Sequence, residues 1–124
     1  MKFIRFWFPA ILYSGIIFRV SSIADVTIPL PELQFDKFLH ILVYLPFGFL
    51  VARGIDGSRP SIFPKSLWIL VVLATFLYGL SDEYHQFFVP GRNFGIFDLM
   101  ADTIGGAIGG FIFLLLRRKV KEVN

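Results

Sequence analysis

The chain has 124 residues, enough for one domain, and 56% of them are hydrophobic, including 16 phenylalanines. A small soluble core cannot bury that much apolar surface, so the composition indicates a membrane protein. The chain has no cysteine, which excludes a disulfide framework and thiolate chemistry. Its net charge is +3, but its basic residues do not form a patch interleaved with aromatic residues, so the sequence does not support nucleic-acid binding.

The first apolar stretch covers about residues 4–23, which is long enough to cross the hydrocarbon core of a bilayer. A secretory signal peptide is an alternative, because Lys2 precedes the stretch and residues 22–24 have the small-x-small pattern of a cleavage site. We favour a retained transmembrane helix, because Arg19 interrupts the region that a signal peptide keeps apolar.

Three more apolar stretches follow, at about residues 37–52, 66–88 and 96–116. The second stretch is short for a span, which needs about 20 residues, and Pro46 inside it predicts a kink. The segment 53–65 is rich in glycine and proline and predicts a loop. The expected fold is all-α, a four-transmembrane-helix bundle in one domain over residues 1–124.

Lysine and arginine are distributed unevenly among the expected loops. Nine of the twelve lie on the side shared by the two ends of the chain and the loop 53–65, and the other three are Arg19, Lys37 and Arg92. The positive-inside rule therefore predicts that both termini are cytoplasmic. Seven of the nine acidic residues then lie at or near the opposite, outer side, which predicts one polar site there.

Helical spacing groups the polar residues of this outer end. Asp36, His40 and Tyr44 are spaced i, i+4 and i+8, so they form one stripe. Asp98 and Asp102 repeat the i, i+4 spacing at the start of the fourth stretch.

The end of the third stretch carries the other polar group. Asp82, His85 and Gln86 share one helical face, and Glu83 lies about 100° around the helix from Asp82. The segment 89–92, Val-Pro-Gly-Arg, predicts a type II turn that places its arginine beside these acids.

Small residues continue below the aspartates of the fourth stretch. Ala101, Gly105 and Gly109 form one small-xxx-small ridge, and Gly106 and Gly110 form a second. Such ridges permit close approach of membrane helices, so we expect this helix to be tightly packed.

Three interpretations of the polar cluster remain open. In the first, the cations and histidines neutralise the acids and hold the bundle together. In the second, the cluster binds an anionic lipid headgroup and uses a histidine or carboxylate for proton transfer. In the third, a divalent metal is held by His40, His85, Asp82 and Asp98.

Longer motifs show a resemblance to a known family. They are Asp36-Lys37-x-x-His40-x-x-x-Tyr44, the segment 79–92, and Asp98-Leu99-x-Ala101-Asp102-Thr103-x-Gly105, with Ser21-Ser22 before them. Over about residues 10–115 the chain resembles the VanZ-like family of small bacterial integral membrane proteins. The resemblance implies a multi-pass protein of the bacterial inner (cytoplasmic) membrane and a link to resistance toward the glycopeptide antibiotic teicoplanin. The family usually has Asn where this chain has Asp102, which adds an acidic group to the cluster.

We therefore expect a cell-envelope protein whose outer-leaflet pocket binds, and in one version processes, a phospholipid or a lipid-linked cell-wall precursor. The alternatives are a non-catalytic accessory protein that alters antibiotic target presentation and a small transporter, and a homo-oligomer is compatible with each. The candidate catalytic residues are Glu83, His85, Asp82 and His40. The candidate ligand-binding residues are Arg92, Lys37, Arg19, Asp36, Tyr44, Gln86, Asp98 and Asp102.

Overall fold

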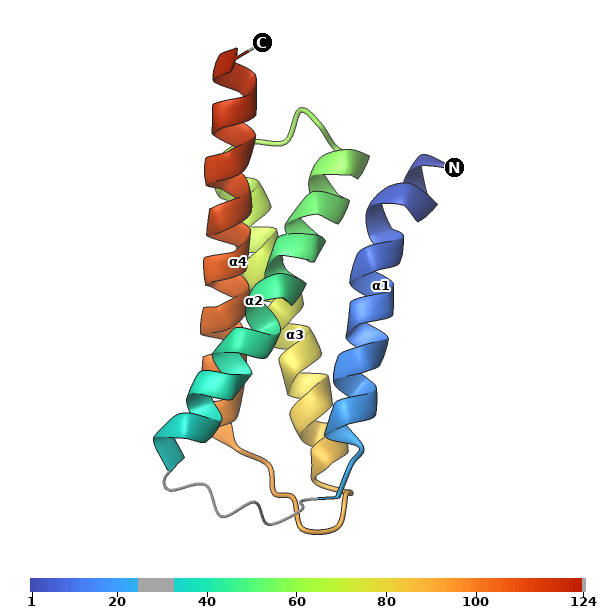
Figure 1. The fold of residues 1–124 in the computed structure, drawn as a ribbon, viewed down its shortest axis with the longest axis vertical. Helices are drawn as coiled ribbons and strands as arrows, with labels where there is room; N and C mark the ends of the chain where they lie inside the picture. Colours follow the sequence, from blue (N-terminus) through green and yellow to red (C-terminus); the bar gives the residue numbers. More distant parts are fainter. Residues whose placement is uncertain (25–32, 124) are drawn as a thin grey trace.

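The computed structural model describes residues 1–24 and 33–123, and these residues contain four α-helices and no strand. The helices are α1 (Lys2–Ser21), α2 (Leu33–Ser58), α3 (Pro64–Gln86) and α4 (Ile96–Val123). All four are long and apolar enough to cross a membrane, which confirms the expected all-α bundle. Both termini and the α2–α3 connection lie at one end of the bundle, and the α3–α4 connection lies at the other (Figure 1).

The second helix is longer than the predicted stretch of 37–52, because its polar residues are used in contacts between helices. Arg53 Nη1 donates hydrogen bonds to two backbone carbonyl oxygens of α1, at 3.1 and 3.2 Å. Asp56 pairs with Arg117 of α4, at 2.9 Å. The helix therefore continues through the first part of the segment 53–65 and ends at Ser58, while residues 59–63 form the expected loop, and Pro46 lies inside the helix.

The glycine ridges of α4 face two different helices. A Cβ atom at Gly105 would lie 2.5 Å from the carbonyl oxygen of Ile41, and one at Gly109 would overlap the α2 backbone in the same way. Cβ atoms at Gly106 and Gly110 would instead meet side chains of α3. The predicted close packing is confirmed, and it brings the aspartates of α4 against both α2 and α3.

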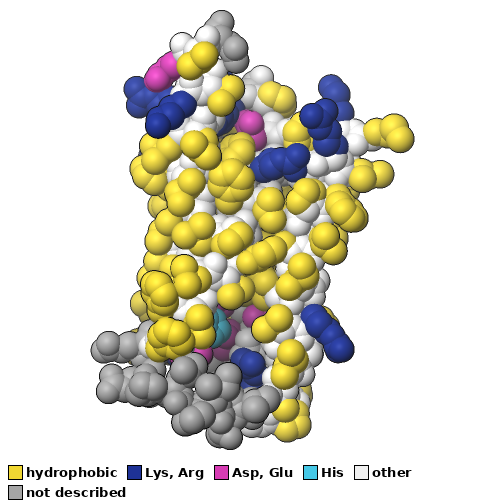
Figure 2. All heavy atoms as spheres, in the orientation of Figure 1, with side chains coloured by type: hydrophobic (Ala, Val, Ile, Leu, Met, Phe, Trp, Pro, Cys, Tyr) yellow, Lys and Arg dark blue, Asp and Glu magenta, His cyan; other side chains and the backbone are white. Residues whose placement is uncertain are grey.

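The surface of the bundle is apolar, while several of its most deeply buried side chains are polar. Phe8, Leu73 and Phe111 are each more than half exposed, whereas Glu83 and Asp102 are fully buried. Hydrophobic side chains cover the middle of the visible face, and most of its Lys and Arg side chains gather at the end that carries the termini (Figure 2). A lipid environment explains an exposed surface of this kind.

Candidate functional site

The connection between α3 and α4 closes the polar end of the bundle. Gly91 has a positive φ of 80°, and Arg92 N–H donates to the carbonyl oxygen of Val89 at 3.1 Å, so the predicted turn forms. Three residues later, the backbone N–H of Gly95 donates to Glu83 Oε2 at 2.8 Å. The connection thereby fixes one carboxylate of α3 at the point where α4 begins.

The first polar network joins α2 to α4. His40 Nδ1 donates to Oδ1 of Asp102 at 2.8 Å, and His40 Nε2 lies 4.0 and 3.9 Å from carboxylate oxygens of Asp36 and Asp98. The ammonium of Lys37 lies between the same two carboxylates, 3.2 Å from Asp36 and in direct contact with Asp98. The imidazole is therefore held in one orientation among three acids.

The second network joins α1, α2 and α3. Asp82 Oδ2 accepts hydrogen bonds from Tyr44 Oη and Gln86 Nε2, both at 3.3 Å. The same Gln86 nitrogen contacts Ser21 Oγ at 3.2 Å, and Arg92 Nη1 donates to Gln86 Oε1 at 3.4 Å. These contacts align five side chains along one wall of the polar end.

Two of the predicted site residues lie apart from these networks. His85 Nε2 is 2.9 Å from Ser22 Oγ, and its ring stacks on Phe18 with ring centroids 4.4 Å apart. Arg19 is exposed on α1, where it borders a shallow groove lined mainly by apolar side chains. The structure brings together His40 and the acids of α2, α3 and α4, but places His85 against α1.

Three carboxylates of the polar end are buried and only partly hydrogen-bonded. Asp82 is 4% exposed, and Glu83 and Asp102 are 0% exposed. One oxygen of each, namely Asp82 Oδ1, Glu83 Oε1 and Asp102 Oδ2, has no hydrogen-bond partner within the described part of the chain. Because unpartnered buried oxygens cost free energy, these groups point to a proton or a cation at the site.

Among the described residues, two groups of three side chains have the geometry to hold a metal ion. Both include His40, which joins Asp36 and Asp98 in one group and Glu83 and Asp102 in the other. In each group the ligand atoms lie within 4.8 Å of one another. Neither group contains the histidine of α3 that the sequence-based ligand set included.

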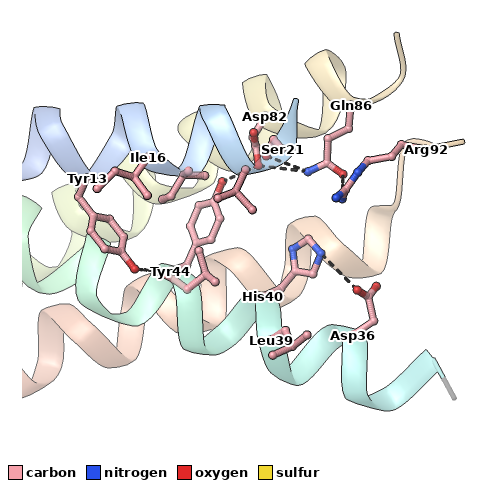
Figure 3. Close-up of a pocket in the computed structure, with 13 residues that line it drawn as sticks. Tyr13, Ile16, Ser21, Asp36, Leu39, His40, Tyr44, Asp82, Gln86 and Arg92 are labelled. Atoms are coloured by element: carbon pink, nitrogen blue, oxygen red, sulfur yellow. Dashed lines mark hydrogen bonds and ion pairs between the residues drawn. The ribbon is translucent and has the colours of Figure 1, made fainter. Parts of the chain in front are cut away.

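A cavity of about 320 Å³ lies between α1 and α2 and reaches the polar end of α3 (Figure 3). One part of its lining is apolar apart from a tyrosine, and these residues are Tyr13, Ile16, Ile17, Val20, Leu39 and Val43. The other part is polar, and its residues are Ser21, Asp36, His40, Tyr44, Asp82, Gln86 and Arg92. The lining of the cavity is therefore amphipathic.

The family motif included Ser21, but the sequence did not single out the apolar residues that α1 contributes to this cavity. Tyr13 Oη donates to the carbonyl oxygen of Val43 at 2.8 Å, and Ile17 is 4% exposed beside it. A hydroxyl inside an apolar stretch was the available signal for Tyr13. Nothing in the sequence separates Ile17 from isoleucines of α1 outside the cavity, such as Ile11, which is 55% exposed.

Comparison with known proteins agrees with the motifs. Residues 3–117 match the family model described as VanZ/LLP1, a range that includes nearly all of the four helices and the whole polar end. Neither the search of curated proteins nor the search of solved structures found a significant match. The chain, with its four apolar helices, therefore belongs to the VanZ/LLP1 family and has the form of a multi-pass membrane protein.

Proposed function

We propose that this protein binds one anionic lipid, a phospholipid or a lipid-linked cell-wall intermediate, in the cavity between α1 and α2. The amphipathic lining of the cavity carries the proposal, because it offers hydrocarbon contacts along one part and polar contacts at the other. Ile16 is 51% exposed and Val43 is 39% exposed, so the apolar part of the cavity reaches the surface of the bundle. An acyl chain can lie there while its headgroup contacts the polar end.

Arg92 is the cation best placed for a lipid phosphate. Its Nε donates to the carbonyl oxygen of Ile23 at 3.1 Å and its Nη1 to Gln86, which leaves Nη2 without a partner among the residues described. A guanidinium held in this way presents a fixed donor to an anion at the cavity wall. Lys37, the other candidate, does not line the cavity, and its ammonium contacts the carboxylates of Asp36 and Asp98.

Processing of the bound lipid is a second candidate function, and one contact favours it. His40 lines the cavity and is oriented by Asp102, as an acid–base group in a catalytic site would be. Asp82 also lines the cavity, whereas Glu83 and His85 do not. Proton transfer to a headgroup would therefore use His40, with Asp82 as the nearest carboxylate.

The proposed setting is the inner membrane of a bacterium, with both termini cytoplasmic and the polar end in the outer leaflet. The nine basic residues near the termini and the α2–α3 connection support this orientation. A protein that binds a lipid-linked intermediate there would change how antibiotic targets are presented, which is how we connect it to teicoplanin resistance. A small transporter is less well supported, because the polar groups lie in the terminal turns of α2, α3 and α4 rather than near the middle of these helices.

Native mass spectrometry of the purified protein tests the proposal by identifying the lipids that it retains. We expect the wild-type protein to retain an anionic lipid in preference to a zwitterionic one. Arg92→Gln should reduce that retention at least about tenfold, since a hydrogen bond to a charged group contributes about 1.5–3 kcal/mol. Arg19→Gln is the matched control and should leave retention unchanged, because Arg19 lies outside the cavity. Equal loss in both variants, or no preference in the wild type, would contradict the proposal.

A further inference from the structure

The polar end of the bundle contains more buried acidic groups than the nearby cations can neutralise. α3 and α4 contribute Asp82, Glu83 and Asp102, none of them more than 4% exposed. The ammonium of Lys37 is already shared by two other carboxylates. His40 is the one basic side chain that contacts a member of this buried group within the described residues.

One subset of these groups has the geometry of a cation site. One ligand atom from each of His40, Glu83 and Asp102 lies within 4.8 Å of the other two, and His40 Nδ1 and Asp102 Oδ1 are 2.8 Å apart. An ion bound to these two atoms would replace their hydrogen bond and release its proton. Bonds of about 2.0–2.2 Å to a shared metal place neighbouring ligand atoms about 3 Å apart, with small side-chain adjustments bringing in the third. Three ligands from α2, α3 and α4 would therefore surround one ion.

The contacts around these ligands support this subset over the neighbouring one. Glu83 Oε2 is fixed by the N–H of Gly95, while Glu83 Oε1 is fully buried and has no partner in the described ranges. In the other subset, Asp36 and Asp98 contact the ammonium of Lys37, which already supplies a positive charge there. A second cation at that position would be repelled.

We propose that His40, Glu83 and Asp102 bind a divalent transition-metal ion, Zn²⁺ or Mn²⁺, inside the bundle. One imidazole nitrogen with two carboxylates is a ligand set that suits these ions better than the all-oxygen set preferred by Ca²⁺ or Mg²⁺. The ion would neutralise two buried carboxylates and connect three helices. Glu83 and Asp102 lie outside the cavity lining and His40 lies in it, so the ion site borders the cavity, and metal binding can be measured without a lipid ligand.

Titration of the purified, chelator-treated protein with Mn²⁺ tests this site directly. Loss of the electron paramagnetic resonance signal of free Mn²⁺ should show one bound ion per chain. Electron spin echo modulation should detect one coordinated nitrogen, and the melting temperature should rise with added Mn²⁺. A wild-type protein that binds no Mn²⁺, or whose bound ion shows no nitrogen coordination, would overturn the proposal.

Four variants assign the ligands. Glu83→Gln and Asp102→Asn should each weaken Mn²⁺ binding more than about tenfold, as expected when a ligand is lost. His40→Gln should remove the nitrogen modulation. Asp36→Asn is the matched control, because it removes a neighbouring carboxylate of the other subset, and it should change affinity less than about twofold. Weakening of Mn²⁺ binding by Asp36→Asn as large as that by Asp102→Asn would overturn the assignment. Thermal melts with a chelator present identify any variant that fails to fold. If a ligand variant fails to fold, the nitrogen signal of the wild-type protein decides whether His40 binds the ion.

Discussion

Gly48 of α2 lies directly against the backbone of Gly106 of α4, so closely that a Cβ atom on Gly48 would fall 2.6 Å from the Cα of Gly106. Real Cβ atoms do not approach backbone atoms to this distance, so the two helices must separate to accept any larger residue. We therefore expect Gly48→Ala to lower the free energy of unfolding by about 1–3 kcal/mol, the usual range for overpacking. Gly15→Ala is the control, since a Cβ there meets nothing within 4 Å. Thermal melts in detergent that ranked the two variants equally would contradict this packing.

Asp102 allows a second stability comparison, made with a chelator present. Asp102→Asn keeps an oxygen that can accept from His40 Nδ1–H and removes a buried acidic group. We expect its melting temperature to equal or exceed that of the wild type. Asp102→Ala leaves the imidazole without its partner and should cost about 1–3 kcal/mol. An Asn variant as unstable as the Ala variant would show that the negative charge itself stabilises the bundle.

The two histidines should differ in their effect on lipid retention. His40→Gln alters the polar wall of the cavity and should reduce retention of the anionic lipid. His85→Gln alters a contact with Phe18 and Ser22 outside that wall, so it should leave lipid retention unchanged. Native mass spectrometry of both variants gives the comparison. Loss of retention in the His85 variant alone would indicate that the ligand contacts α1 and α3 instead.

Filling the apolar part of the cavity should block lipid binding without touching a charged group. Val43→Trp adds an indole to the cavity lining, and we expect about a tenfold loss of retained lipid. Leu73→Trp is the matched control, because Leu73 is 51% exposed on α3 and does not line the cavity. Comparable losses in both variants would argue against binding between α1 and α2.

The absence of cysteine from the chain makes the membrane orientation simple to test. Asn93 lies in the α3–α4 connection and Ser61 in the α2–α3 connection, and both are exposed. In intact cells a membrane-impermeant maleimide should label Asn93→Cys, but should label Ser61→Cys only after lysis. The reverse pattern would place the termini outside and the polar end in the inner leaflet.

Hydropathy alone predicted the number of helices and the all-α class, but it placed the end of α2 too early. Arg53 and Asp56 have the composition of a loop, yet each is satisfied by another helix: Arg53 by α1 carbonyls and Asp56 by Arg117. Both side chains are paired with residues far away in the sequence, and a local sequence pattern cannot predict such contacts. α4 likewise continues to Val123 instead of ending near residue 116.

Helical spacing predicted the stripe of Asp36, His40 and Tyr44 on α2 correctly, because all three residues line the cavity. The same reasoning grouped His85 with Asp82, although the structure turns His85 toward α1. A helical face spans a wide arc, and the position of the neighbouring helices decides which part of that arc meets the site. The position of the neighbouring helices depends on packing between helices, and residue spacing within one helix gives no information about it.

The apolar mouth of the cavity, where Ile16 and Val43 reach the surface between α1 and α2, has a consequence for how a ligand arrives. A lipid moving sideways could place its headgroup beside Arg92 while its chains stayed in hydrocarbon. The rate of binding would then depend on the lateral diffusion of the lipid and on its abundance in one leaflet. The low solubility of the lipid in water would not limit this rate.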